Sequence, residues 1–404
     1  MSSVRTVPLG DIASFVRGVT FKPDDIVEDS PEDTVDVLRT KNVQTELDLS
    51  DVWAISPHHV KREEQYTQEG DILISSANSW NLVGKCSWIP ELDRRTTFGG
   101  FVTVLRGDSA RVNRRYLYHW FSSPKVQATV RSYSRQTTNI SNLDLKRCGS
   151  LAVPLPEMRE QERIVEVLDQ VDTLRVKRRQ SMALLDDLVS SIIWKTLPGD
   201  AEIACLDDVL QRRLRNGISP SSKGTCEGKV LTLSSLTRGD FDESAWKIGL
   251  FESDPTKEYS VKSNMFMLVR GNGNKRLVGV GRFSSVAIPD VVYPDTVLAA
   301  PIREDLIVPE YLEAIWKTSA VRRQVEAVAR TTNGTYKVNQ KTMGAVKIPL
   351  PGKGWQIEFQ ERVQAVLRAR NLHRDHLAKL DELFTSVRQR AFNGTFWDRE
   401  PMST

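Results

Sequence analysis

Residues 154–198 read PLPEMREQERIVEVLDQVDTLRVKRRQSMALLDDLVSSIIWKTLP, and this segment sets the organisation of the whole chain. Its Pro-Leu-Pro ends the strand before it, because proline cannot continue a backbone hydrogen-bond ladder. The residues that follow repeat apolar side chains at helical spacing. A matching segment stands at residues 349–393, PLPGKGWQIEFQERVQAVLRARNLHRDHLAKLDELFTSVRQRAFN. The sequence therefore predicts two long helices, each beginning after a Pro-Leu-Pro.

Each predicted helix carries a seam of positions that alternate four and three residues apart. The first seam comprises Ile164, Leu168, Val171, Arg175, Arg178, Met182, Leu185, Val189 and Ile192. The second comprises Val363, Val366, Arg370, His373, Leu377, Leu380, Phe384 and Val387. Apolar heptads of this length need a long partner helix, so we expect the two helices to form an intramolecular coiled coil.

Both seams contain a polar break, at Arg175 and Arg178 in one helix and at Arg370 and His373 in the other. The pseudo-twofold symmetry of a duplicated chain favours an antiparallel pair, in which the two breaks are expected to meet near the middle. A parallel pair would also align them. The basic residues around the first break either grip DNA or a partner, fix the helix register or face solvent.

One spacing, 195 residues, relates many parts of the chain. The matched segments are Val83-Gly84 with 278–279, Tyr116-Leu117 with 311–312, Arg135 and Thr137 with Arg330 and Thr332, Pro154–Pro156 with 349–351, Leu185-Asp186 with 380–381, and Leu188 with Leu383. An ordered series at one offset indicates a tandem duplication.

Before each Pro-Leu-Pro the chain consists of short β-rich runs, such as residues 71–74, 101–105 and 265–269, separated by Gly, Asn, Asp and Pro. We therefore predict an α+β fold with two tandem, mostly-β domains, each followed by a long helix. The expected bounds are 1–154 for the first domain, 155–198 for the central helix, 199–350 for the second domain and 351–404 for the C-terminal helix.

The charge is unevenly distributed, although the net charge over 404 residues is only +4. Residues 24–71 contain 14 acidic and 4 basic side chains, whereas residues 94–147 contain 11 basic and 2 acidic ones. Residues 262–347 contain 13 basic and 7 acidic side chains. Basic faces of this kind track phosphate in nucleic-acid-binding proteins, and an ordinary solvated surface explains them equally well.

Several classes of protein are disfavoured. No run of about 18 apolar residues predicts a membrane span, and the N-terminus does not resemble a secretory signal, so we expect a cytoplasmic protein with no membrane partner. The four cysteines lie far apart without a Cys-x-x-Cys motif, which argues against a disulfide framework or a zinc ribbon.

The residues after each Pro-Leu-Pro resemble a known family. Residues 160–165 (Glu-Gln-Glu-Arg-Ile-Val) with 185–188 (Leu-Asp-Asp-Leu), and 359–363 (Phe-Gln-Glu-Arg-Val) with 380–383 (Leu-Asp-Glu-Leu), are similar to type I restriction-modification specificity subunits. The second copy departs from the pattern by an apparent insertion at residues 352–355 and by lacking the Glu-Gln pair at the equivalent place.

The resemblance implies that each β-rich domain is a target recognition domain that reads half of a bipartite site in double-stranded DNA, while the helices set the unread spacer. Methylation and cleavage would belong to partner methyltransferase (modification) and restriction/translocase subunits. The cofactor S-adenosylmethionine is expected on the methyltransferase subunit and none in this chain.

Base recognition requires Arg or Lys for guanine and Asn or Gln for adenine, presented on loops that reach the major groove. For each such residue the alternative is an ordinary turn or cap. The expected DNA-binding residues are Arg39, Lys41, Asn42, Ser76, Asn78, Trp80, Arg135, Gln136, Thr137, Asn139, Arg270, Asn272, Asn274, Lys275, Arg276, Arg330, Thr332 and Asn333.

We expect neither a catalytic nor a metal site. The Asn/Asp-Pro-Pro-aromatic motif of adenine methyltransferases does not occur in the sequence. Asp208 with Glu227 and Lys229 only superficially matches a nuclease site, and His373 with His376 offers no convincing third ligand. Two alternatives to DNA reading stay open: a two-domain adaptor that binds proteins, and an enzyme with an unfamiliar nuclease or methyltransferase site.

Overall fold

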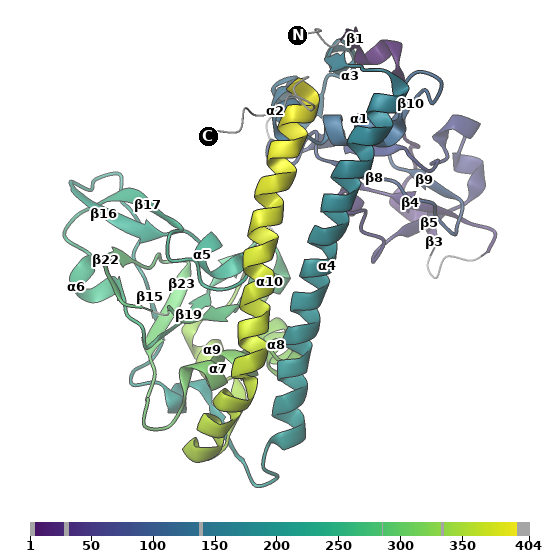
Figure 1. Cartoon of the computed structure of the whole chain (residues 1–404). Coiled ribbons are helices and arrows are strands. Elements are labelled where there is room, and N and C mark those ends of the chain that lie inside the picture. Colours follow the sequence, from purple (N-terminus) through teal and green to yellow (C-terminus); the bar gives the residue numbers. More distant parts are fainter. Residues whose placement is uncertain (1–4, 28–31, 137–139, 285, 333–334, 394–404) are drawn as a thin grey trace, which may run out of the picture. The chain divides into compact units, whose positions relative to one another are not determined.

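The computed structural model describes residues 5–27, 32–136, 140–284, 286–332 and 335–393. The chain divides into two compact units: residues 1–178 with 376–404, and residues 179–375. Two helices, α4 (Met158–Thr196) and α10 (Lys353–Asn393), each contribute to both units (Figure 1). The domain bounds expected at residues 154, 198 and 350 stay predictions, because the compact units divide both helices.

The first unit combines small sheets with short helices. Its sheets have the strand orders β2-β10-β6-β8, β3-β5-β4-β9, β11-β12-β7 and β1-β13. The strands are β1 (Thr6–Pro8), β2 (Ala13–Arg17), β3 (Ile26–Val27), β4 (Val35–Leu38), β5 (Trp53–Ile55), β6 (Ile72–Ser75), β7 (Ala77–Asn78), β8 (Cys86–Trp88), β9 (Thr96–Phe98), β10 (Val102–Gly107), β11 (Ser134–Gln136), β12 (Ser141–Leu143) and β13 (Ala152–Pro154). The short α-helices are α1 (Arg114–Phe121), α2 (Pro124–Ser132) and α3 (Leu145–Gly149).

The second unit is built in the same way. Its sheets have the orders β15-β23-β19-β21, β17-β16-β22-β18, β20-β25-β24 and β14-β26. The strands are β14 (Glu202–Cys205), β15 (Arg215–Asn216), β16 (Cys226–Leu231), β17 (Trp246–Phe251), β18 (Ser260–Val261), β19 (Met265–Val269), β20 (Gly271–Asn272), β21 (Gly281–Arg282), β22 (Ile288–Val292), β23 (Val297–Pro301), β24 (Arg330–Thr332), β25 (Thr335–Lys337) and β26 (Lys347–Leu350). The short α-helices are α5 (Ser234–Thr237), α6 (Thr256–Tyr259), α7 (Pro309–Trp316), α8 (Ser319–Val328) and α9 (Gln340–Gly344).

The two units repeat each other sheet by sheet, as the offset of 195 residues predicts. The order β2-β10-β6-β8 corresponds to β15-β23-β19-β21, and the parallel pair β4-β9 corresponds to the parallel pair β16-β22. One edge strand differs, because β3 pairs with β5 whereas β18 pairs with β22. The α+β class and the tandem arrangement are therefore confirmed.

Each Pro-Leu-Pro is anchored by a buried tyrosine. The hydroxyl of Tyr116 donates to the carbonyl oxygen of Pro154 at 2.7 Å, and that of Tyr311 donates to Pro349 at 2.7 Å. Both rings are fully buried, and burial raises the pKa of both hydroxyls above the ordinary value. The hydroxyls remain protonated donors. The end of β13 is therefore fixed to α1, and the end of β26 is fixed to α7.

A buried glutamine joins each long helix to the same region. The side-chain oxygen of Gln161 accepts from the backbone N–H of Asn113 at 2.9 Å, and that of Gln356 accepts from Val308 at 2.9 Å. Each side-chain nitrogen donates to the last carbonyl of its own Pro-Leu-Pro, at 2.9 and 2.8 Å respectively. Asn113 and Val308 are the N-cap residues of α1 and α7, so the glutamines join equivalent elements.

One expectation about the second helix start is wrong, whereas the Glu-Gln pair is absent as expected, because Trp355 precedes Gln356. Residues 352–355 are not an insertion before the helix, because α10 begins at Lys353. The equivalent of Gln161 is Gln356, which lies 195 residues later and makes the same contacts. The error arises because residues 359–363 look like residues 160–164, although the register places them four positions further along.

The two long helices run antiparallel, as predicted. Within the second unit, Arg370 pairs with Asp186 at 2.7 Å, while the indole N–H of Trp355 donates to the carbonyl of Thr196 at 2.9 Å. Residues further along α4 therefore contact residues nearer the start of α10, which is the antiparallel arrangement. Figure 1 shows α4 and α10 side by side.

Each polar break contains an arginine that pairs with an aspartate of the opposite helix, and a meeting of the two breaks near the middle stays a prediction. In the first unit the guanidinium of Arg175 donates to Asp381 at 2.6 Å, and in the second Arg370 pairs with Asp186. Asp381 lies 195 residues after Asp186, just as Arg370 lies 195 residues after Arg175. Each unit therefore contains the same arginine–aspartate pair between the helices.

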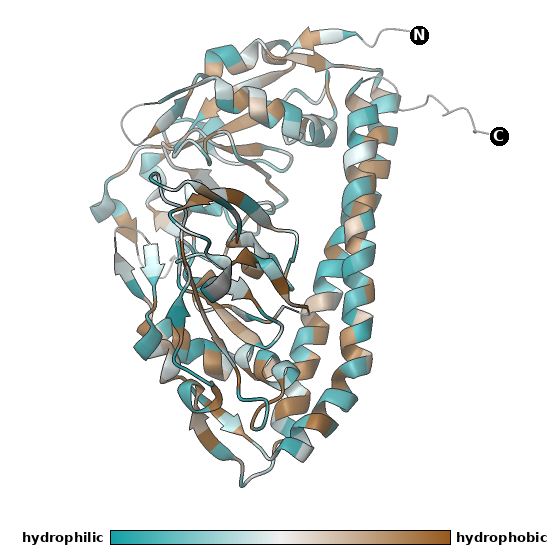
Figure 2. Cartoon of the chain, turned by 90° about the vertical axis from the view of Figure 1, so that its left-hand side faces the viewer, coloured by the Kyte–Doolittle hydropathy of each residue, from teal (hydrophilic) through white to brown (hydrophobic). Residues whose placement is uncertain are grey.

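The ends of the seams belong to the cores of the β-rich domains. Ile164 and Leu168 pack with Phe384 in the core of the first unit. Phe359 and Val363 pack with Val189 in the core of the second unit. Figure 2 shows hydrophobic and hydrophilic residues alternating along both helices. The apolar seams predicted from the sequence therefore stabilise the domains as well as the helix pair.

One carboxylate of the second β-rich domain binds α10. Asp240, in the loop between α5 and β17, accepts from Arg370 and from Arg374, each at 2.6 Å. Burial opposes ionisation of Asp240, but the charge of Arg370 and its hydrogen bond outweigh this effect and lower the pKa of the carboxyl. The contact is therefore made by an ionised aspartate.

We predict that Gln356→Ala destabilises the second unit, because it leaves the buried N–H of Val308 without its acceptor. An unsatisfied buried polar group costs about 1–3 kcal/mol. Urea unfolding followed by circular dichroism measures the change. Gln364→Ala, at an exposed position of the same helix, is the matched control. Equal stability of the two variants would refute the structural role of Gln356.

We predict that Asp240→Asn lowers stability at neutral pH by about 1.5–3 kcal/mol, the usual contribution of hydrogen bonds to charged groups. Because the folded pKa of Asp240 is depressed, its contribution is present above the unfolded pKa near 4 and is lost as pH falls through the folded value. Urea unfolding between pH 3 and 7 should therefore show a weaker acid dependence in the variant. The exposed Asp305→Asn is the control, and curves parallel to wild type for Asp240→Asn would contradict the assignment.

Candidate nucleic-acid interface

The loops predicted separately from the sequence meet at one small sheet in each unit. In the first unit, residues 77–78 and 134–136 pair with opposite sides of β12. In the second, residues 271–272 and 330–332 pair with opposite sides of β25. The sequence predicts these segments as matched loops. That both loops of a unit join the same three-stranded sheet is seen only in the structure.

Asparagine side chains shape the loops that lead to these sheets. The side-chain oxygen of Asn272 accepts from the backbone N–H of Asn274 at 2.9 Å, and that of Asn274 accepts from Arg276 at 3.0 Å. In the first unit, the side-chain oxygen of Asn78 accepts from the N–H of Ser79 at 2.8 Å. These contacts hold the turns in place and leave Arg276 exposed at the surface.

Cross-strand pairing places exposed polar side chains next to one another. In the second unit Arg330 lies opposite Lys337, which lies opposite Gly271 on its other side. In the first unit Arg135 lies opposite Asn142. Arg330, Lys337, Arg135 and Asn142 are all exposed. The second sheet therefore presents two adjacent cations where the first presents one cation and one amide.

Sequence analysis missed Lys337 and Asn142. Each follows a predicted loop by only a few residues, and the two lie 195 residues apart. Extending the repeat alignment across the loops could have found them. Their place in the sheet depends on long-range strand pairing, which a local motif search does not detect.

The region around Arg135 is basic. Its side chain is 84% exposed and pairs with Asp144 at 3.3 Å. The backbone N–H of Arg147 holds the pKa of the Asp144 carboxyl below its usual value, and the carboxyl caps α3. Lys146 and Arg147 of that helix are exposed. Gln136, beside Arg135 in β11, is also exposed.

The loop at residues 39–42 lies in a different part of the first unit. The guanidinium of Arg39 donates to the carboxylate of Asp51 at 2.8 Å and lies 3.7 Å from the ring centroid of Trp53. Lys41 pairs with the same carboxylate. The hydrogen bond from Lys41 holds the pKa of Asp51 below its usual value. The two cations therefore share one carboxylate, and the loop keeps a net positive charge.

The prediction that Asn42 contacts DNA is wrong. The residue is 1% exposed. Its side-chain oxygen accepts from the N–H of Arg39 at 2.7 Å, and its nitrogen donates to the carbonyls of Asp48 and Asp51 at 2.6 and 3.0 Å. The amide therefore holds the loop together and has no surface to offer a base.

The other predicted residues differ in exposure. Ser76, Asn78 and Arg270 are half-buried, and Arg270 donates to the carbonyl of Asp295 at 3.3 Å. Trp80 is 44% exposed. The remaining predicted positions are as follows: Lys275 is exposed, Thr332 pairs with Thr335 through the backbone, and Thr137, Asn139 and Asn333 lie outside the described residues.

The candidate nuclease residues are used elsewhere. The carboxylate of Asp208 accepts from the backbone N–H of Cys205 at 2.8 Å, and Lys229 pairs with Asp290 at 2.7 Å. In the described part of the chain, no three His, Cys, Asp or Glu side chains are grouped as a metal site requires. No helix among the described residues is long and apolar enough to cross a membrane.

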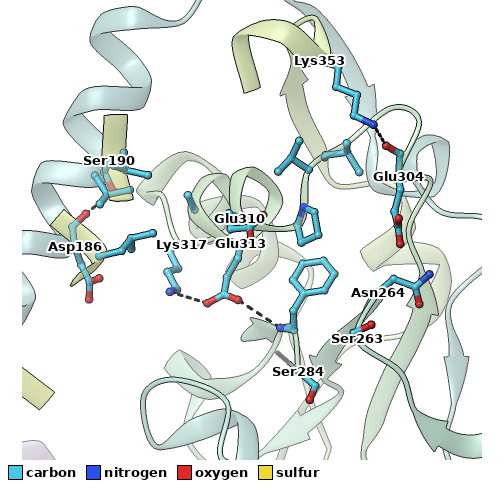
Figure 3. Close-up of a pocket in the computed structure, with 18 residues that line it drawn as sticks. Asp186, Ser190, Ser263, Asn264, Ser284, Glu304, Glu310, Glu313, Lys317 and Lys353 are labelled. Atoms are coloured by element: carbon cyan, nitrogen blue, oxygen red, sulfur yellow. Dashed lines mark hydrogen bonds and ion pairs between the residues drawn. The ribbon is translucent and has the colours of Figure 1, made fainter. Parts of the chain in front are cut away.

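A pocket of about 570 Å³ lies in the second unit, beside α7 and the second unit's segments of α4 and α10 (Figure 3). Its lining includes the carboxylates of Asp186, Glu304, Glu310 and Glu313, with the amines of Lys317 and Lys353. Lys317 pairs with Glu313 at 2.9 Å, and Lys353 contacts the carbonyl of Glu304. Carboxylates outnumber amines, so this pocket is unsuited to phosphate and is not part of the nucleic-acid interface.

Comparison with known proteins agrees with this geometry. A sequence model of the type I restriction modification DNA specificity domain matches residues 1–182. The specificity subunit of the type I restriction enzyme EcoKI from Escherichia coli K12 is 23% identical over 411 residues, covering 96% of this chain and 88% of the relative. The StySPI specificity subunit from Salmonella potsdam is 22% identical over 413 residues, with the same coverages.

Among solved structures, the S subunit of a type I restriction-modification system from M. genitalium is similar, with 12% identity, 97% coverage of both chains and a TM-score of 0.49. The first 182 residues match a DNA specificity domain, and the sheets of the second unit repeat those of the first. The resemblance predicted from the helix-start motifs is confirmed, because the chain is similar over 96% of its length to a type I restriction enzyme specificity subunit.

Proposed function

We propose that each β-rich domain reads one half of a bipartite DNA target and that the three-stranded sheets β11-β12-β7 and β20-β25-β24 carry the reading loops. The observation that carries this proposal is that matched loops converge on the same sheet in both units. Each sheet thereby gathers exposed polar side chains from segments that lie far apart in the sequence.

The exposed side chains of these sheets suit DNA chemistry. Arg330 and Lys337 lie on adjacent strands, where they can bind phosphate oxygens or the acceptor edge of guanine. Arg135 and Gln136 of the first unit offer a cation and an amide, the groups that suit guanine and adenine respectively. The difference between the sheets supports recognition of two different half-sites.

The proposal includes a division of labour. Partner modification subunits, which bind S-adenosylmethionine, would methylate the target, and restriction/translocase subunits would cut DNA. This chain would supply sequence recognition without catalysis, with its helices as the spacer between the half-sites. The similarity to specificity subunits supports this assignment.

We predict that Lys337→Ala weakens DNA binding by the assembled complex and reduces the slope of log affinity against log salt by about 1, the value for one lost phosphate contact. Fluorescence anisotropy between 50 and 200 mM salt measures both effects. Lys262→Ala is the matched control, because Lys262 is exposed near the opposite end of β19 from this sheet. An unchanged slope would exclude a phosphate contact by Lys337.

We predict that the purified chain alone does not transfer a methyl group from S-adenosylmethionine to DNA, whereas addition of the partner modification subunits restores methylation at one bipartite sequence. Incorporation of labelled methyl groups, followed by mapping of the modified sites, measures both outcomes. Methylation by the isolated chain would show that it is an enzyme. Selective methylation without this chain would show that it is not the specificity component.

A further inference from the structure

Phe101 is an exposed aromatic residue in an otherwise buried stretch. It lies between β9 and β10 and is 66% exposed, while Phe98 and Val102 on either side are 0% and 1% exposed. Gly99 and Gly100 precede it. The chain therefore turns one large apolar ring toward solvent, where burial against a partner would be favourable.

The backbone of Phe101 is fixed beside the candidate DNA-reading sheet. Its carbonyl oxygen accepts from the N–H groups of Ser76 and Ala77 at 3.0 and 3.1 Å. Ala77 begins β7, and Asn78 of that strand pairs with Ser141 of β12. The ring therefore projects from a position attached to the same strand that carries a predicted base reader.

Other exposed apolar side chains lie near this strand. Trp80 follows Asn78 by two residues and is 44% exposed. Ile140 precedes Ser141, the partner of Asn78, and is 44% exposed. Phe101 and Ile140 occur within the strongly basic segment of residues 94–147, which favours a polyanion as the partner rather than a second apolar protein surface.

The fold itself does not require an aromatic residue here. In the second unit Arg270 donates from its backbone N–H to the carbonyl of Thr296 at 2.8 Å, which is the contact equivalent to that between Ser76 and Phe101. Thr296 is half-buried and small. The same backbone arrangement therefore forms without the exposed ring, so Phe101 serves something other than folding.

We infer that Phe101 contacts the 5-methyl group of a thymine in the half-site read by the first domain. This inference rests on the proposed function. A phenyl ring cannot hydrogen-bond to a base edge, and the apolar group in the major groove is the thymine methyl. Insertion of the ring between bases would also require unstacking, whereas methyl contact leaves the duplex intact.

The test is a cycle of protein and DNA changes on the assembled complex. Each thymine of the bipartite target is replaced in turn by deoxyuridine, and affinity is measured for wild type and Phe101→Ala. At one position wild type should lose about fourfold, the effect of one buried methyl group. Phe101→Ala should bind the thymine target more weakly and show no loss at that position.

Ile203→Ala is the matched control, because Ile203 is 61% exposed in β14 of the second unit. It should respond to deoxyuridine as wild type does. The inference is overturned if Phe101→Ala keeps the wild-type response at every position, if the target contains no thymine, or if the variant loses partner assembly instead of base preference. A wild-type complex without sequence-selective binding would instead refute the proposed function.

Discussion

A buried glutamine at the start of each long helix is the contact on which the rest of the structure depends. Pro-Leu-Pro leaves backbone groups that no strand or helix satisfies, because proline lacks an N–H. Gln161 and Gln356 accept the N–H of an N-cap residue and donate to the last proline carbonyl. One side chain thereby joins the long helix to the end of its Pro-Leu-Pro and to the N-terminus of an earlier short helix, α1 or α7. Each β-rich domain is therefore attached to its own long helix in a defined way.

The arginine–aspartate pairs between α4 and α10 fix the register of the two long helices. Arg175 with Asp381 and Arg370 with Asp186 interrupt the apolar seam at equivalent places in the two units. A polar group inside a coiled coil lowers stability but specifies register, because any other alignment leaves the charge unpaired. Asp240 adds to this in the second unit, where it binds the buried Arg370. The duplicated framework therefore also carries contacts that are not duplicated.

Much of this could be predicted from sequence. Heptad spacing identified both helices, because the period of a helix can be read within one segment. The offset of 195 residues identified the repeated sheets, because the same residues recur at a fixed distance. Asn42 was misassigned because its burial depends on Asp48 and Asp51, which approach it only in the folded loop. Lys337 was missed because its neighbour Arg330 is set by strand register, which no motif in either segment encodes.

The repeat also explains where functional differences can accumulate. Positions that hold the framework are the same or chemically equivalent in both copies, as Tyr116 and Tyr311 illustrate. Positions on or beside the small sheets diverge, since Asn142 corresponds to Lys337 in the sheets and Phe101 corresponds to Thr296 beside them. Exposed side chains on short, firmly paired strands can change with little cost in stability, because they contribute few buried contacts. A scaffold of this kind separates the residues that fold the protein from those that select its ligand.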